Sequence, residues 1–280
     1  MKITSHQFLT TALLSPAILI LALSFLAPLG RLVLISFSSP KGLFYAYSQL
    51  FEDEIFATVF LNTTTIATIV TLLAIVIAYP VAFALTKVSK GWHAILLACV
   101  LLPLWISVLV RTFAWMVLLE RNGPVNTLLV SSGILEKPIS LLFNHASVGI
   151  GMLHVLLPYA VLPMYAALVQ IEPNLLRASE GLGASRTTTF LKVLLPLSLK
   201  GIATAATFTF LLSLGFFVTP ALLGGASSLT LSMLIDSFVS DRLNWPLASA
   251  ASVILLVAAL LVVAISKRFI ALTSFARVHQ

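Results

Sequence analysis

The chain alternates long apolar stretches with short polar segments, and this pattern predicts helices that cross a membrane. A membrane helix needs about 20 consecutive apolar residues. Six stretches meet that requirement, and they cover residues 12–36, 57–86, 94–119, 146–170, 196–220 and 246–266. The first stretch is too long for a signal-peptide core, so we expect it to be a retained span. The pattern predicts an all-α integral membrane protein with six transmembrane helices in one domain, residues 1–280.

Composition supports the same conclusion. Of the 280 residues, 60% are hydrophobic and 9% are charged, whereas a soluble domain carries roughly 25% charged residues. The single cysteine, Cys99, excludes an intrachain disulfide. The sequence has no Gly-rich phosphate loop ending in Gly-Lys-Ser/Thr, so any ATP used by this system, with its Mg, is expected on another chain. We expect no cofactor and no metal site on this chain.

The distribution of basic residues predicts the orientation in the membrane, because cytoplasmic loops carry an excess of Lys and Arg. One set of loops is rich in basic residues, and these are Lys2, Lys87, Lys90, Arg177, Arg186, Lys192, Lys200, Lys267, Arg268 and Arg277. The opposite set holds only Lys41, Arg121, Lys137 and Arg242. We therefore expect both termini and the loop 172–195 in the cytoplasm. The asymmetry explains most of the net charge of +7 without a nucleic-acid partner.

The loop 172–195 has a spacing of charge, glycine and proline that lipid contact does not require. We expect two short helices in it. Asn174 would cap the first and Ser185 the second, which runs from Arg186 to Leu195 before Pro196 opens the fifth span. Gly181 and Gly183 would end the first helix in left-handed conformations. Such a rigid loop fits docking to another protein, although an amphipathic loop lying on lipid headgroups is an alternative.

This spacing resembles the EAA loop of permease subunits in ABC-type importers, in which Glu-Ala-Ala precedes three residues, Gly, nine residues, Ile, one residue and Leu-Pro. The matching positions here are Gly183, Val193, Leu195 and Pro196. Further patches resemble the spermidine/putrescine branch of that family, and they lie at 103–107 with Arg111-Thr112, at 215–225 and at 244–246.

The resemblance implies the type I ABC importer permease fold in a bacterial inner membrane. It also implies three kinds of partner: a homologous second permease, two cytoplasmic ATP-binding subunits and an extracytoplasmic solute-binding protein. The residues that it assigns to ATPase coupling are Arg177, Ala178, Ser179, Glu180, Gly183, Ala184 and Pro196.

The loop departs from the family pattern at its start. Arg177 stands where the motif has glutamate, and Ser179 replaces the second alanine. Glu180 follows Arg177 by three residues, on the same helical face. Either Glu180 supplies the acid that contacts the ATPase, or this subunit docks through shape and backbone. We favour docking that is intact with altered charge.

The six spans contain no Asp or Glu, and only Arg111 and His154 bring ionisable groups to depth. A secondary carrier usually depends on intramembrane carboxylates or broken-helix ion sites, so this pattern disfavours one. Arg111 is a pathway candidate, or it fixes helix packing by pairing with helix-end carbonyls, Glu120 or Asp236. We expect His154 to be a hydrogen-bonded packing residue.

A cationic amine would be recognised by aromatic faces and acids. Plausible pathway residues are Trp115, Tyr159, Phe216, Phe217 and Asp236, together with Arg111. A short gating helix is expected over 231–239. The same aromatic residues also suit membrane-interface belts or packing.

The leading hypothesis is a non-catalytic importer subunit that forms half of the pathway for a polyamine or a similar small organic amine. Opine-like or aminoalkylphosphonate solutes are alternatives in the same class. A stand-alone secondary carrier and a membrane assembly or signalling subunit are alternatives in other classes.

Overall fold

The computed structural model describes residues 5–275, with side chains from 13 to 270, and this part of the chain is helical with connecting loops and no strands. Lys2 and Arg277, which entered the orientation argument, lie outside the described residues. The chain divides into two compact units. Unit 1 contains residues Met1–Phe56 and Ile235–Leu256, and unit 2 contains Ala57–Leu234 and Val257–Gln280.

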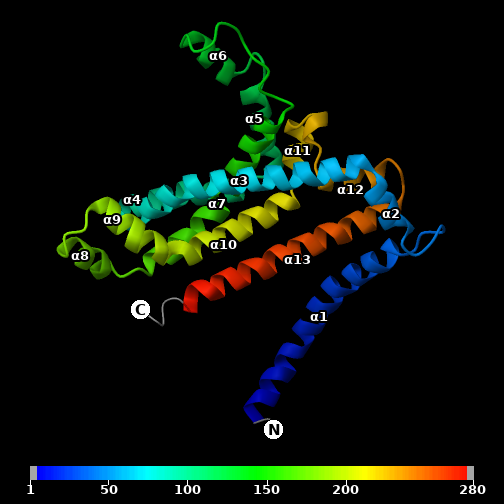
Figure 1. Ribbon diagram of the computed structural model, residues 1–280, viewed down its shortest axis with the longest axis horizontal. Helices are drawn as coiled ribbons and strands as arrows, with labels where there is room; N and C mark the ends of the chain where they lie inside the picture. The colour runs from blue at the N-terminus through cyan, green and yellow to red at the C-terminus, as the bar shows by residue number, and fades with distance from the viewer. Residues whose placement is uncertain (1–4, 276–280) are drawn as a thin grey trace. The chain divides into compact units, whose positions relative to one another are not determined.

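Figure 1 shows the order of the helices along the chain. They are α1 (Ser5–Ser36), α2 (Tyr45–Glu52), α3 (Glu54–Lys87), α4 (Lys90–Trp105), α5 (Val108–Leu119), α6 (Pro124–Ser131), α7 (His145–Val169), α8 (Pro173–Gly181), α9 (Arg186–Thr189), a π-helical turn (Phe190–Leu194), α10 (Leu195–Leu214), α11 (Val218–Leu223), a short 3₁₀ turn (Ala226–Ser228), α12 (Leu231–Ser240) and α13 (Trp245–Phe275).

Unit 1 is built from α1, α2, most of α12 and the first half of α13. The hydroxyl groups of Ser36 and Tyr47 lie 2.8 Å apart and join the end of α1 to α2. The amide oxygen of Asn244 accepts a hydrogen bond from the backbone N–H of Leu247 and so caps the start of α13. By contrast, most of the apolar side chains of α1 between residues 13 and 36 are exposed, Leu19 and Leu23 among them, as expected of a surface that faces lipid or another subunit.

Unit 2 holds the main core, where α3, α7 and α10 pack together. Alanines at every fourth position of α3, Ala74, Ala78 and Ala82, are fully buried against this cluster. At Gly201 of α10, a Cβ atom would lie 2.4 Å from the Cβ of Ala167 in α7. Small residues of this kind let membrane helices approach closely, since lipid offers no hydrophobic driving force between them.

The predicted spans agree with long apolar helices at most positions. Within the described residues, five helices are long and apolar enough to cross a membrane, or up to six if α4 and α5–α6 form one bent span. The stretches 12–36, 57–86, 146–170 and 246–266 correspond to α1, α3, α7 and α13. The short helix predicted over 231–239 corresponds to α12.

The third predicted span, 94–119, is not one continuous helix. Helix α4 ends at Trp105, α5 begins at Val108, and the chain bends by 99° between them. Ile106 and Ser107 have extended backbones, with ψ of 133° and 137°. Pro103 has no N–H and its ring crowds the preceding turn, so α4 ends two residues later. The carbonyl of Ser107 then accepts from Arg111 N–H and starts the new helix.

The fifth predicted span, 196–220, differs from the observed helix at both ends. Helix α10 ends at Leu214 with Gly215 as its cap, and residues 218–223 form the separate helix α11. A helix that ends at glycine reflects the low helix propensity of that residue. At the other end, the helical run begins at Arg186 and continues to Leu214.

Candidate functional site

The loop 172–195, to which the family resemblance assigns ATPase coupling and which we call the coupling loop, folds from strong local signals. Helix α8 begins with Pro173 in its first turn, a position that suits proline because its missing N–H is not needed there. Glu172 is the N-cap and its side chain makes no capping hydrogen bond. The predicted cap at Asn174 is therefore wrong, since proline sets the start of the helix one residue earlier.

The end of α8 is a Schellman motif centred on Gly183. Gly183 N–H donates to the carbonyl of Glu180 at 3.0 Å, and Ala184 N–H donates to the carbonyl of Ser179 at 3.2 Å. Gly183 has a φ of +87°, which glycine adopts without strain. The prediction for Gly183 is confirmed. The prediction for Gly181 is wrong, because Gly181 is the last residue of α8 and is not among the positive-φ glycines.

Helix α9 starts as predicted, with the Ser185 hydroxyl accepting a hydrogen bond from Thr188 N–H at 3.2 Å. It does not stop before the fifth span. Instead the π-helical turn Phe190–Leu194 joins it to α10, and Leu195 N–H donates to Phe190, five residues back. Pro196 in the first turn of α10 has no N–H, so a regular i→i−4 ladder cannot pass through this point.

A side-chain hydrogen bond links the two short helices. The hydroxyls of Ser179 in α8 and Thr189 in α9 lie 3.0 Å apart, and Thr189 is buried. This bond and the Schellman turn hold α8 against the base of the long helix. The coupling loop is therefore an ordered helical element that Figure 1 shows at one end of α3, α7 and α10.

Helix α8 has two distinct faces. Pro173, Leu176, Arg177 and Glu180 follow the i, i+3, i+4, i+7 spacing of one helical face, and all four line a cavity. Leu175 and Ala178 point elsewhere and are exposed, as is Leu182 just beyond the helix, which is 89% exposed. These side chains leave apolar surface uncovered on the side of α8 that faces away from the cavity.

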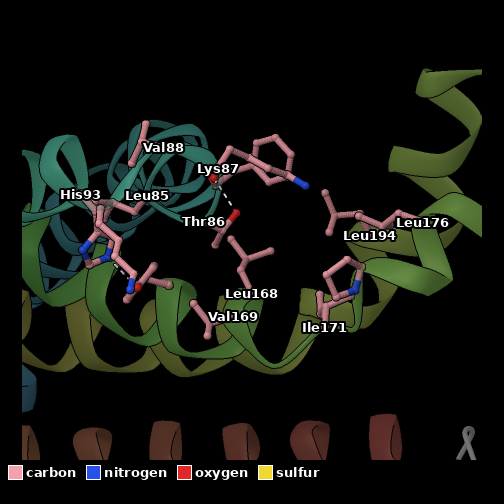
Figure 2. Close-up of a pocket in the computed structure, with 14 residues that line it drawn as sticks. Leu85, Thr86, Lys87, Val88, His93, Leu168, Val169, Ile171, Leu176 and Leu194 are labelled. Atoms are coloured by element: carbon pink, nitrogen blue, oxygen red, sulfur yellow. Dashed lines mark hydrogen bonds between the residues drawn. The ribbon is translucent and has the colours of Figure 1, made fainter.

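The cavity beneath α8 lies among the ends of α3, α4 and α7. One lobe of 390 Å³ includes Lys87, Lys90 and His93, and an adjoining lobe of 610 Å³ includes Lys87, Arg177 and Arg186. Figure 2 shows Thr86 and Lys87 facing Leu168 and Val169 of α7, with Leu176 and Leu194 toward one end. We call the two lobes the basic cavity.

One wall of the basic cavity is fixed by a contact between distant residues. His93 Nε2 and the Tyr165 hydroxyl lie 2.7 Å apart and tie α4 to α7. Lys87 Nζ lies 5.4 Å from the centre of the Phe83 ring, a cation–π contact. In the sequence, Lys87 and Lys90 served only to predict the orientation of the chain in the membrane. Their meeting with Arg177 and Arg186 around one cavity depends on tertiary packing.

Two of the predicted pathway residues lie in a second cluster of unit 2. Trp115 Nε1 donates to His154 Nδ1 at 3.0 Å, and the two rings meet edge to face with centroids 5.8 Å apart. The prediction that His154 is a hydrogen-bonded packing residue is confirmed. Trp115 and Phe216 also pack against the buried core formed by α3, α7 and α11.

Arg111 of α5 is an unusual residue of unit 2. Its side chain is 9% exposed, and its Nε and Nη1 atoms are buried with no hydrogen-bond partner in the described structure. His154 and Tyr159 lie within electrostatic range of it. No ion pair between Arg111 and Glu120 is present in the described structure, so that alternative for Arg111 is not realised. Burying an arginine without a partner is energetically costly.

The remaining pathway candidates are dispersed. Tyr159 of α7 is 40% exposed, and Phe217, the N-cap residue of α11, is also exposed. Asp236 belongs to unit 1, where it is exposed and accepts a hydrogen bond from Ser240. Helices α5 and α11 are joined by the Thr112 and Thr219 hydroxyls, 3.1 Å apart. Within residues 5–275 no group of three His, Cys, Asp or Glu side chains could hold a metal ion.

The fold has solved counterparts among ABC transporters. It is similar to a chain in a crystal structure of a bacterial ABC transporter involved in the import of the acidic polysaccharide alginate, with a TM-score of 0.81, 22% identity, and coverage of 95% of this chain and 96% of that chain. The structure of a bacterial alginate ABC transporter in complex with an alginate pentasaccharide-bound periplasmic protein gives the same TM-score. At this level of identity, the likeness concerns the fold.

Residues 80–273 match the family model described as binding-protein-dependent transport system inner membrane component. The chain belongs to this family of ABC importer permeases, and it is a multi-pass protein of the inner membrane.

Its relatives in sequence carry a more specific name. It is 34% identical over 264 residues to the spermidine/putrescine transport system permease protein PotB of Haemophilus influenzae, covering 90% of this chain and 91% of the relative. It is 31% identical over 209 residues to PotB of Escherichia coli, covering 75% of this chain and 76% of the relative. These matches confirm the resemblance inferred from the loop and the apolar patches.

Proposed function

We propose that this chain forms half of the translocation pathway of an ATP-driven importer for a polyamine or a similar small organic amine. A homologous second permease would form the other half. Two cytoplasmic ATPase subunits would drive it, and an extracytoplasmic binding protein would deliver the solute. The names of the sequence relatives support the solute class, and both termini would lie in the cytoplasm.

The observation that carries the proposal is the ordered coupling loop with its exposed outer face. Leu175, Ala178 and Leu182 offer a narrow apolar surface on which an ATPase groove could close. Because α9 is continuous with α10, a displacement of the loop would tilt a helix that packs directly against α7. Rocking of packed helices is a common way to open and close a transport pathway.

For an amine cargo, this chain would supply aromatic faces rather than buried acids. Tyr159 and Phe217 present exposed rings in unit 2, and a cation over such a ring gains about 0.5–2 kcal/mol depending on desolvation. Trp115 is held by its hydrogen bond to His154. Asp236 would attract the cation from unit 1. Selection of the solute would fall mainly to the binding protein.

The experiment introduces charge on the outer face of α8. In the importer purified through a tagged permease, Leu182→Glu should lower the amount of co-purified ATPase several-fold and abolish ATP-dependent uptake in proteoliposomes. Folding should be unaffected, since the side chain is 89% exposed. Ile134→Glu is the matched control, because Ile134 is also exposed and lies in the loop after α6. Normal ATPase recovery and uptake with Leu182→Glu would refute the coupling role.

A second candidate cargo is an amine that also carries an acidic group, such as an opine-like compound or an aminoalkylphosphonate. The unpartnered guanidinium of Arg111 favours it, because arginine binds carboxylate and phosphonate groups through paired N–H donors. Competition for uptake distinguishes the two. Spermidine should compete and an amino acid-like compound should not if the cargo is a polyamine. If instead the amino acid-like compound competes and spermidine does not, and if Arg111→Gln abolishes that competition, the second candidate is established.

A further inference from the structure

The basic cavity gathers positive charge that the transport pathway does not use. Four cations line it, Lys87, Lys90, Arg177 and Arg186, against the single carboxylate of Glu180. Within the described part of the chain none of these four cations forms an ion pair, and the Lys87 ammonium group lies over the Phe83 ring. A cleft lined by one sign of charge concentrates ions of the opposite sign.

The walls of the cavity are apolar where they meet the membrane helices. Leu85 near the end of α3, Leu168 and Val169 at the end of α7, and Leu194 line the cavity together with the cations. Their helices are membrane-spanning candidates that end at this level. A ligand that fills the cavity would therefore combine an anionic head with an apolar body. Basic pockets at the cytoplasmic ends of membrane helices suit such headgroups.

We propose that the basic cavity binds the phosphate group of an anionic phospholipid, with Lys87 and Arg177 as its principal ligands. Lys87 lines both lobes, and Arg177 reaches the cavity from α8. The volumes of 390 and 610 Å³ fall within the range of small-molecule sites. The site is independent of which solute is carried.

The position of Arg177 gives the lipid a consequence for coupling. One face of α8 lines the cavity, and the opposite face is exposed. A bound phosphate would join Arg177 of α8 to Lys87 of α3 and hold the coupling loop against the bundle. Arg177 stands where the family motif has an acid, and in this site its positive charge has a use.

The test measures lipid binding to the full-length chain in detergent by native mass spectrometry. Phosphatidylglycerol and phosphatidylcholine are titrated separately. The wild type should retain one phosphatidylglycerol more tightly than phosphatidylcholine. The double variant Lys87→Ala with Arg177→Ala should weaken that binding about tenfold or more. Lys267→Ala with Arg268→Ala is the matched control, because it removes the same charge from exposed positions on α13 outside the cavity.

Further arms separate the sources of the anion. Equal losses in the two double variants would overturn the site in favour of general surface attraction. Displacement of the lipid by millimolar inorganic phosphate would overturn the lipid assignment and leave a free-phosphate site. Unchanged lipid binding with lost ATPase recovery in the cavity variant would assign these cations to the ATPase instead. If the double variant fails to fold, Lys87→Gln against Lys267→Gln makes the same comparison, and Lys87→Arg should restore binding.

Discussion

Gly183 is the residue at which the geometry of the coupling loop is most open to test. Its φ of +87° lies in the left-handed region, and a Cβ atom built there meets nothing within 4 Å. Within this chain, a side chain at position 183 therefore acts through the backbone conformation and not through a clash of its Cβ atom with a neighbour. Substitution acts on the Schellman turn that sets the position of α8.

The structure gives the expected order of effects. An L-residue in the left-handed region costs about 1–2 kcal/mol, and a β-branched residue lies at or above the upper end. Asparagine tolerates this region better than other residues with a side chain. We expect Gly183→Asn to be mild, Gly183→Ala intermediate and Gly183→Val severe. A cost of about 2 kcal/mol lowers the population of the native turn relative to alternatives by roughly 30-fold.

The assay is ATP-dependent uptake by the reconstituted importer, measured beside the membrane content of the permease. Gly183→Val should reduce uptake several-fold while insertion remains normal. Gly181→Ala is the matched control, because Gly181 lies in the same loop, is helical and has open space at its Cβ position. Alanine there should be neutral or stabilise α8 by up to about 1 kcal/mol.

Two results would refute the reasoning. Full uptake with Gly183→Val would show that the turn does not transmit movement. Equal defects in Gly183→Asn and Gly183→Val would show that the effect comes from the side chain's presence and not from the backbone conformation.

Three further changes test the packing on which the site depends. Gly201→Val should destabilise the protein by about 1–3 kcal/mol through overpacking against Ala167, measured as a lower melting temperature in detergent. Thr112→Val removes the partner of the buried Thr219 hydroxyl, so we expect a loss of about 1–3 kcal/mol in the same measurement. Ser185→Ala removes the N-cap of α9 and should cost about 1 kcal/mol, detected as faster hydrogen exchange at the start of that helix.

Two matched variants serve as controls for the predictions on Gly201 and Thr112. Gly149→Ala lies on α7 with open space at its Cβ position, so its melting temperature should stay near the wild type. Thr112→Ser keeps a hydroxyl and should retain most of the stability that Thr112→Val loses. If Gly149→Ala lowers the melting temperature as much as Gly201→Val does, close packing between α7 and α10 is not the cause.

Hydrophobic length alone located four of the six spans closely, since lipid requires it of every crossing helix. The same signal could not locate the break between α4 and α5. Both sides of Ile106 are equally apolar, and a bend changes neither composition nor length. Pro103 was visible, but membrane helices often continue through proline, as α7 does at Pro158 and Pro163.

Local chemistry predicted part of the coupling loop. Gly183 and Ser185 act through bonds to residues within five positions, so sequence spacing was informative. The basic cavity was not predicted, because His93 meets Tyr165 across 72 positions of the chain. Likewise the missing partner of Arg111 is a property of packing, and the residue type alone left a structural role open.

The wide turn Phe190–Leu194 between α9 and α10 accommodates one residue more than a regular α-helix needs. The wide turn takes up this residue locally, so the residues before it keep nearly the angle around the helix axis that an uninterrupted α-helix would give them. Deleting one residue from the regular part of α10 would instead rotate everything before that point by about 100°. The direction in which Ser185 and Arg186 face relative to α10 is therefore more tolerant of a one-residue length change inside this turn than anywhere else along the helix.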